Sequence, residues 1–270
     1  MNDAHTRRWF VTASLLLPAA LFGWRRAAAQ TTPPSAGPPD PRLVEDLVAA
    51  NRILVDQGVL DGYGHVSVRH DRDPNRYLMA RSLAPELVTA ADVMEYDLDS
   101  VAVDPRGRGL YLERFIHGEI YKVRPDVKAV VHHHSPSVIP FGVTPRTLKP
   151  IYHMAAFLGE GAPVFEIRRF GGVTDMLVRT PALGQALAQT LGADSALLMR
   201  GHGGVVVGPT IRHAVARSIY MEVNAKLQQQ ALALGPVTYL DPEEATTTDA
   251  AVSGTYARPW ELWKKKAMAR

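Results

Sequence analysis

The sequence predicts one α/β domain in which helices cover both faces of a sheet. The chain has 270 residues, of which 46% are hydrophobic, and this is enough for a sizeable core. Segments with helical periodicity interleave with short, apolar, strand-like segments, and no internal repeat is visible. Such interleaving is typical of layered α/β proteins.

Turn and capping residues divide this domain into elements. Asp40 followed by Pro41 predicts the start of a helix that ends near Gly58. Residues 65–69 alternate in the manner of a strand, and residues 77–80 are predicted to be its hairpin partner. The same signals predict later helices over residues 112–123, 181–191 and 210–234, and strands over residues 127–131, 196–199 and 205–207.

The first residues differ in kind from the rest. Arg7 and Arg8 precede an apolar run that ends at Trp24, and small residues follow up to Ala29, a pattern typical of an export signal over residues 1–29. Residues 6–11 resemble a twin-arginine signal, which implies export of a folded protein, loaded with its cofactor, to the periplasm. The alternative is an ordinary secretory signal with two incidental arginines.

The two ends of the domain are predicted from composition. Residues 30–41 are rich in proline and are predicted to form an extended tether. Residues 42–240 then form the folded domain, and residues 241–270 form a C-terminal extension. Packing of Trp260 and Trp263 on a neighbouring subunit is one interpretation of this extension.

Composition also restricts ligands and partners. Residues 1–29 hold four of the 30 basic residues and one of the 27 acidic ones, so the chain that follows has 26 of each and gives no support for nucleic acid binding. No later segment approaches the roughly 20 apolar residues of a membrane span. Because cysteine is absent, any metal must be held by nitrogen and oxygen.

Three histidines are predicted to hold a metal ion. His132 and His134 follow an apolar strand, and their side chains project from the same face about 6–7 Å apart along the backbone. His133 points to the opposite face, where a subunit contact is one interpretation. His202 is the third candidate, because the glycines on both sides of it give its loop room to approach an ion.

Glu113 is the carboxylate expected near these histidines. It opens the helix predicted over residues 112–123, among apolar neighbours such as Leu112 and Phe115. Burial there would raise the pKa of Glu113 toward that of a working acid or base. The alternative is a solvated residue that is favoured by the helix dipole.

These motifs together resemble the class II aldolase/adducin family. The resemblance lies in the order and spacing of Glu113, of the histidine run with its preceding strand, and of Gly201-His202-Gly203. It includes residues 64–69 near the start and covers residues 43–234.

The resemblance implies a three-layer α/β/α class II aldolase-like fold with a central mixed, largely antiparallel sheet, assembled as a homotetramer. It implies a divalent metal on His132, His134 and His202, with Zn2+ favoured over Mn2+, Co2+ and Fe2+. Glu113 is then a fourth ligand, or it moves aside to act as the catalytic acid/base.

Two departures from the sugar-phosphate aldolases of the family concern the substrate. This chain has His65 where those enzymes carry an asparagine, and Tyr111-Leu112 where they carry paired serines. An unphosphorylated, aromatic substrate is therefore expected. Its predicted ligands are His65, Ser67, Tyr152 and Arg200. Arg200 is placed to hold a carboxylate, with a surface arginine as the alternative.

The function predicted from these observations is a divalent-metal-dependent carbon–carbon lyase. It would act on a small unphosphorylated hydroxy-carbonyl compound or hydroxyaryl carboxylic acid, by aldol-type cleavage or decarboxylation through a metal-stabilised enolate or carbanion. Arg-Gly-His-Gly at residues 200–203 is similar to the branch of the family that decarboxylates hydroxylated aromatic acids. The alternatives are a non-haem iron oxygenase and a non-catalytic, adducin-like binding or scaffold protein.

Overall fold

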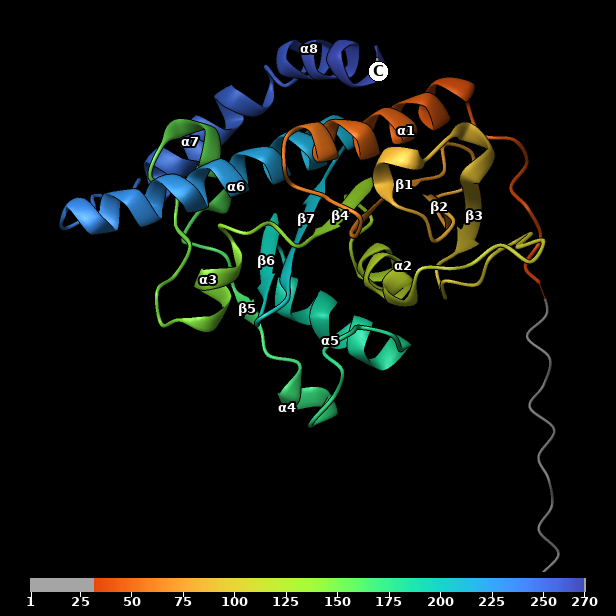
Figure 1. Cartoon of the computed structure of the whole chain (residues 1–270), viewed down its shortest axis with the longest axis horizontal. Helices are drawn as coiled ribbons and strands as arrows, with labels where there is room; N and C mark the ends of the chain where they lie inside the picture. The colour runs from red at the N-terminus through yellow and green to blue at the C-terminus, as the bar shows by residue number, and fades with distance from the viewer. Residues whose placement is uncertain (1–31, 270) are drawn as a thin grey trace, which may run out of the picture. The chain divides into compact units, whose positions relative to one another are not determined.

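The computed structural model describes residues 32–269 of the chain (Figure 1). The predicted signal over residues 1–29 and its cleavage site lie outside the described residues. Residues 32–40 of the proline-rich segment have no regular secondary structure. They are nevertheless held to the domain, because the Ser35 hydroxyl and the Ala36 amide donate to the carboxylate of Glu95.

A seven-stranded sheet runs through the domain in the order β3-β2-β1-β4-β7-β6-β5. Neighbouring strands pair antiparallel except β5 and β6, which are parallel. The predicted mixed, largely antiparallel sheet is therefore confirmed. The strands are β1 His65–Arg69, β2 Arg76–Ala80, β3 Val93–Asp97, β4 Ala129–His133, β5 Val164–Phe165, β6 Ala196–Met199 and β7 Gly203–Gly208.

Helices cover both faces of this sheet, which gives the predicted three layers (Figure 1). One face packs against α1 (Pro41–Asp56) and α6 (Ile211–Leu234), and α8 (Ala257–Met268) lies on the outer side of these two helices. The other face packs against α2 (Phe115–Val123) and α5 (Pro181–Leu191). The remaining elements are α3 Ile139–Val143, α4 Arg168–Gly171, α7 Pro242–Ser253, η1 Pro85–Leu87, η2 Ala90–Asp92, η3 Leu112–Arg114 and η4 His153–Leu158.

The alternation along β4 assigns its side chains to the two layers. Val131 lies in the core with α1 and α6, while Val130 lies in the core with α2 and α5. His132 shares the face of Val130, and it is paired in register with His65 of β1. The candidate site therefore lies on the α2 and α5 side of the sheet.

Local signals located most elements to within two residues. The helix predicted from residue 112 differs, because residues 112–114 form the 3-10 turn η3 and α2 begins at Phe115. Glu113 has φ −93° and ψ 19°, outside the α-helical region, so it lies in the turn before α2 and does not open the helix as predicted. β3, β5, α3, α4, α7 and α8 were not predicted.

The C-terminal helix α8 packs on its own chain. Trp260 and Trp263 are buried in the core that α1 and α6 also contribute to. Lys264 reaches α1 as well, with its Nζ 2.8 Å from Glu45 and 2.7 Å from Asp46. Packing of the two tryptophans on a neighbouring subunit is therefore wrong, because this surface is already covered from within the chain.

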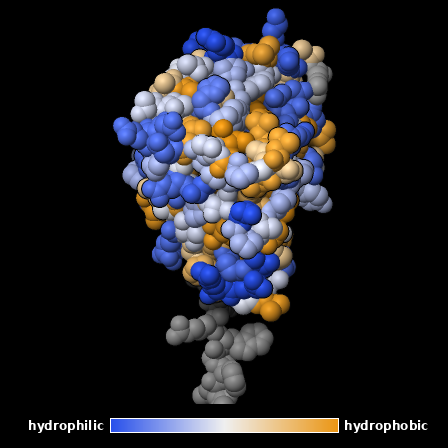
Figure 2. All heavy atoms as spheres, turned by 90° about the vertical axis from the view of Figure 1, so that its left-hand side faces the viewer, coloured by the Kyte–Doolittle hydropathy of each residue, from blue (hydrophilic) through white to orange (hydrophobic). Residues whose placement is uncertain are grey.

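Among the described residues no helix combines the length and apolar character that crossing a bilayer requires. Figure 2 shows that, on the face toward the reader, apolar side chains lie in small groups among hydrophilic ones.

Trp260→Ala is expected to lower the free energy of unfolding by about 3–5 kcal/mol, because it empties a buried aromatic site between helices. Leu262→Ala is the matched control on the same helix, since Leu262 is 53% exposed, and it should change the free energy by less than about 0.5 kcal/mol. Urea unfolding followed by circular dichroism measures both. Equal losses would contradict the packing of α8 on this chain.

Candidate metal centre

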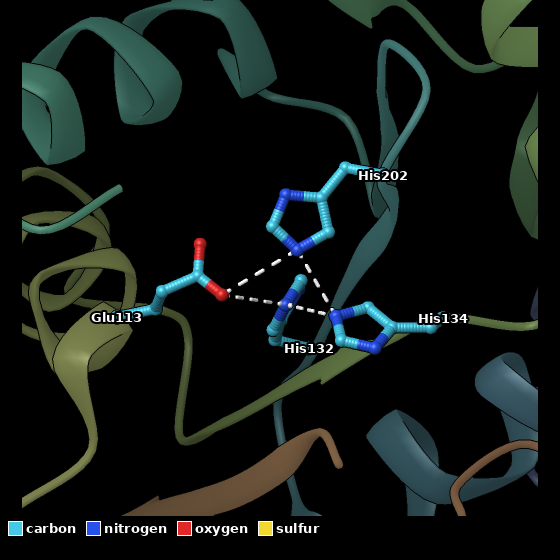
Figure 3. Close-up of side chains that lie close together, drawn as sticks. All are labelled: Glu113, His132, His134 and His202. Carbon is cyan, nitrogen blue, oxygen red and sulfur yellow. Dashed lines mark hydrogen bonds and ion pairs between the residues drawn. The ribbon is translucent and has the colours of Figure 1, made fainter. Parts of the chain in front are cut away.

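Four side chains from three separate parts of the chain converge on one point (Figure 3). His132 stands near the end of β4 and His134 just beyond it, His202 lies in the turn between β6 and β7, and Glu113 lies in η3. One ligand atom from each residue lies within 4.8 Å of all the others. The structure thus brings together all four residues that the sequence predicted for a metal site.

The distances between these atoms match the edges of a small coordination polyhedron. Nε2 of His134 lies 3.1 Å from Nε2 of His132 and 3.0 Å from Nε2 of His202. Oε2 of Glu113 lies 3.3 Å from Nε2 of His132 and 3.4 Å from Nε2 of His202. Four atoms placed tetrahedrally at a zinc–nitrogen bond length are about 3.3 Å apart, so the spacing fits such an ion.

In His132 and His202, the hydrogen bond made by Nδ1 determines that Nε2 is the atom that faces the centre of the cluster. Nδ1 of His132 lies 3.1 Å from the carbonyl oxygen of Gly204, and Nδ1 of His202 lies 3.0 Å from that of Met176. A carbonyl only accepts, so each Nδ1 carries the proton and each Nε2 directs a lone pair inward. Converging lone pairs cannot satisfy one another, whereas a divalent cation satisfies all of them.

Glu113 is buried, which excludes the interpretation as a solvated helix-end residue. Its Oε1 accepts from the Val178 amide at 2.9 Å, so the carboxylate is held with Oε2 toward the histidines. Burial acts to raise the pKa of Glu113, but the charge and hydrogen bonds of His132 and His202 lower it overall, well below its usual range. The predicted upward shift is therefore wrong, and Glu113 is ionised in this arrangement.

The histidines of the cluster differ in their affinity for protons. Burial, together with His132 and His202, lowers the pKa of His134 to about 4, so this imidazole is neutral near pH 7. Burial acts to lower the pKa of His202 as well, but its hydrogen bond and charge contact with Glu113 raise it overall. Neutral imidazole is the form that binds a metal.

The glycines around His202 are required by close contacts in the turn. Gly201 has φ +63°, a left-handed conformation that a side chain disfavours. A Cβ on Gly203 would collide with the carbonyl oxygen of His133, and one on Gly204 would lie 3.2 Å from the His133 ring. The turn can therefore pass close to β4 and deliver His202 beside His132.

His133 points away from the cluster, as the strand alternation predicted. It is completely buried within its own chain, and its Nδ1 accepts from the Ser135 amide at 3.3 Å. The interpretation as a subunit contact is therefore wrong, because the side chain does not reach the surface.

A cavity of about 330 Å³ lies beside the cluster, and Glu113, His132 and His134 form part of its wall. Its walls are mainly aromatic and aliphatic, and His65 and Ser82 contribute polar groups. No lysine or arginine lines it among the residues that the structure describes. The aromatic and aliphatic wall residues are Tyr63, Leu83, Tyr111, Leu112 and Leu177.

Of the four predicted substrate ligands, His65 alone lines this cavity. Ser67 is buried behind His65, where its Oγ is 2.6 Å from Nδ1 of His117. Nε of Arg200 lies 2.7 Å from Glu166, which holds its guanidinium outside the cavity. Tyr152 packs in a separate core cluster that lies toward α6. The structure does not bring these three residues to the cavity.

Several groups at the site were not predicted. The carbonyls of Met176 and Gly204 and the amide of Val178 are backbone groups. Because every residue type has such groups, the sequence could not predict these contacts. Leu83 and Leu177 are ordinary leucines in irregular segments, and the sequence carries no signal for them. Tyr63, within its Gly-Tyr-Gly turn, carried a signal for a tight turn only.

The comparisons with known proteins agree with this geometry. The family described as "Class II Aldolase and Adducin N-terminal domain" matches residues 45–229, so the chain belongs to this family. The chain is 36% identical over 247 residues to "Decarboxylase tropJ" of Talaromyces stipitatus, covering 83% of this chain and 93% of that protein. It is 28% identical to the "3,4-dihydroxyphthalate decarboxylase" of Arthrobacter keyseri, covering 71% of this chain and 79% of that protein.

A similar fold is found among solved structures. The L-fuculose 1-phosphate aldolase from Glaciozyma antarctica PI12 superposes with a TM-score of 0.71 at 25% identity, covering 84% of this chain and 90% of that chain. The predicted class II aldolase fold is therefore confirmed.

His132→Ala and His202→Ala are each expected to abolish retention of a stoichiometric divalent ion, because each removes one of the converging nitrogens. His133→Ala is the matched control on the same strand. It should retain the ion, although the loss of a buried ring lowers stability. Elemental analysis after loading with Zn2+ and desalting measures the result. Equal metal loss from all three variants would contradict the assignment of strand faces.

Proposed function

We propose that the chain is a divalent-metal-dependent carbon–carbon lyase that decarboxylates a small, unphosphorylated hydroxyaryl carboxylic acid. The observation that carries the proposal is that the four-ligand cluster opens onto a cavity with aromatic and aliphatic walls. The similarity to decarboxylases and to an aldolase supports a lyase. Decarboxylation is preferred over aldol cleavage because the two relatives described above are decarboxylases.

The cavity supports a planar, single-ring substrate. About 330 Å³ is near the lower end of ligand-binding volumes, and the walls suit the two faces of an aromatic ring. A phosphate group would find no lysine or arginine in the described lining, and the burial of a dianion without a cationic side chain is costly. The loss of the family's small hydroxyl donors at Tyr111-Leu112 favours the same conclusion.

The proposed metal is held by His132, His134, His202 and Glu113. Three imidazole nitrogens and one carboxylate oxygen suit Zn2+, with Mn2+, Co2+ and Fe2+ as alternatives. When bound, such an ion supplies a Lewis acid that stabilises the negative charge that develops as the carbon–carbon bond breaks.

The residues of the chain perform the other parts of the reaction. Leu83, Leu112 and Leu177 cover the ring and exclude water from the carbon that loses carbon dioxide. Oε2 of Glu113 faces the same space, and in this proposal the carboxylate moves aside from the ion and passes a proton from solvent to the carbon that loses the carboxyl group. The balance is one carboxylate and one proton consumed, and one arene and one carbon dioxide released.

Export and assembly are part of the proposal. The sequence of residues 1–29 supports delivery to the periplasm by the twin-arginine pathway, in which case the metal would be acquired before export. A homotetramer is proposed from membership of the family, and light scattering of the purified protein tests it.

Metal-loaded protein is expected to release carbon dioxide from at least one dihydroxybenzoate or dihydroxyphthalate in a substrate panel, with no aldehyde formed. The panel also contains short hydroxyaldehydes, and the two products are assayed together. Glu113→Gln is nearly isosteric and should lower the rate by at least about a hundredfold, because it cannot carry the proton. Aldehyde release without carbon dioxide would replace decarboxylation with aldol cleavage.

Two controls distinguish the rival functions. Consumption of dioxygen in step with turnover would support an iron oxygenase instead. Protein that binds no stoichiometric ion after loading with Zn2+, Mn2+, Co2+ or Fe2+ would support an adducin-like scaffold.

Sugar phosphates are expected to bind poorly, because the described lining of the cavity offers no cationic side chain. Titration of the Zn2+-loaded protein with L-fuculose 1-phosphate and with its unphosphorylated sugar should give similar, weak heats. Saturation by the phosphate at micromolar concentration would contradict the proposed substrate class.

A further inference from the structure

A chain of buried hydrogen bonds leads from the cavity into the core. Nδ1 of His65 lies 2.7 Å from Nε2 of His117, and Nδ1 of His117 lies 2.6 Å from Oγ of Ser67. Oγ of Ser67 lies in turn 2.8 Å from the hydroxyl of Tyr121. All four side chains are buried, and His65 alone of them lines the cavity.

The hydroxyl of Tyr121, at the inner end of this series of hydrogen bonds, is a donor with a single acceptor. Burial raises the pKa of the Tyr121 phenol well above its ordinary range, against smaller lowering effects of Ser67, Arg69 and the Val130 amide. Tyr121 is therefore a protonated hydroxyl, and the acceptor described for it is Oγ of Ser67. Its proton must point toward Ser67, because an unsatisfied buried donor costs about 1–3 kcal/mol.

The direction of this one hydrogen bond determines all the others. Ser67 accepts from Tyr121, so its own proton is donated to Nδ1 of His117. Nε2 of His117 then carries a hydrogen and donates it to Nδ1 of His65. With Nδ1 occupied as an acceptor, neutral His65 carries its hydrogen on Nε2. The reverse direction has the same number of protons but leaves the Tyr121 hydroxyl without an acceptor.

We infer that Ser67, Tyr121 and His117 are positioning residues that fix His65 as a hydrogen-bond donor, and that its Nε2–H binds an oxygen of the substrate carboxylate. This inference rests on the proposed function, because it takes a carboxylic acid as the substrate. It assigns to Ser67 a role behind the cavity, in place of the direct contact predicted from the sequence.

The rest of the cavity explains why such a donor is needed. Its described lining has no cationic side chain, and Arg200 is held by Glu166 outside it. The hydroxyl of Tyr111 donates to the carbonyl of Leu83 at 2.6 Å, so it is already occupied. An N–H of fixed direction in a confined apolar space is a strong partner for a carboxylate.

The tautomer of His65 is tested on the full Zn2+-loaded chain by nitrogen-15 NMR of labelled histidine. The expected result is hydrogen on Nε2 in the wild type. Ser67→Asp replaces a donor with an acceptor, so hydrogen should move to Nδ1 of both His117 and His65. Ser67→Ala, which adds no buried charge, should remove the preference and give a mixture. Hydrogen on Nδ1 of His65 in the wild type would overturn the inference.

Tyr96→Phe is the matched control, because it removes a buried hydroxyl whose hydrogen bond goes to Met94 and not to any member of this series of hydrogen bonds. It should leave the tautomer of His65 as in the wild type. A change of tautomer in this variant as large as in Ser67→Ala would show that core disturbance alone controls His65, and would also overturn the inference.

Binding of 3,4-dihydroxybenzoate, measured by calorimetry, tests the substrate contact without turnover. Ser67→Asp should weaken it at least about tenfold, since a lone pair then faces the carboxylate. Binding of catechol, which lacks the carboxylate, should change less than about threefold. Unchanged affinity for the acid despite a reversed tautomer would overturn the contact. Wild-type protein with the expected tautomer but no affinity for hydroxyaryl acids would instead contradict the proposed function.

Discussion

The candidate site depends on lone pairs that are forced to face one another. His132 and His202 each donate Nδ1–H to a backbone carbonyl, so neither ring can turn its Nε2 away without breaking that bond. When both rings are neutral, the converging nitrogens and the Glu113 carboxylate repel one another in a buried space, and a proton or a divalent cation between them relieves this repulsion. The fold therefore maintains an arrangement that is unfavourable by itself, and the stability of the surrounding sheet must hold it. A bound divalent ion would remove this cost.

The same strand supplies both the site and the core that supports it. On one face of β4, Val131 packs with α1 and α6, while His132 on the other face belongs to the site. β4 lies in the middle of the sheet, between β1 and β7. His65 enters from β1 and the turn with His202 leads into β7, so both flanking strands position groups around His132. A shift of one residue in either pairing would exchange core and site residues, which specifies the register strongly.

Features with local causes could be predicted from the sequence, and features with distant causes could not. The cap at Asp40 and the alternation in residues 65–69 act within a few residues, and both elements were confirmed. The set of ligands followed from strand alternation and the glycines around His202. Arg200 was misplaced because its ion pair with Glu166 joins β6 to the segment after β5. The pKa of Glu113 was misjudged because burial was counted without the histidines that surround it.

The absence of positive charge in the described lining changes how the cavity can recognise an anion. Arg200 and Arg168 both pair with Glu166, so one carboxylate holds these two guanidinium groups away from the cavity. Recognition of an anion then falls to the cation proposed at the cluster and to oriented dipoles, of which His65 is the one that the buried series of hydrogen bonds controls. A neutral donor distinguishes poorly between anions of different charge. It is selective for the position of the acceptor oxygen, because its N–H points in one direction. Selectivity in this cavity therefore arises from shape and from the fixed tautomer of one histidine, and a phosphate dianion gains too little from either to offset its loss of solvation.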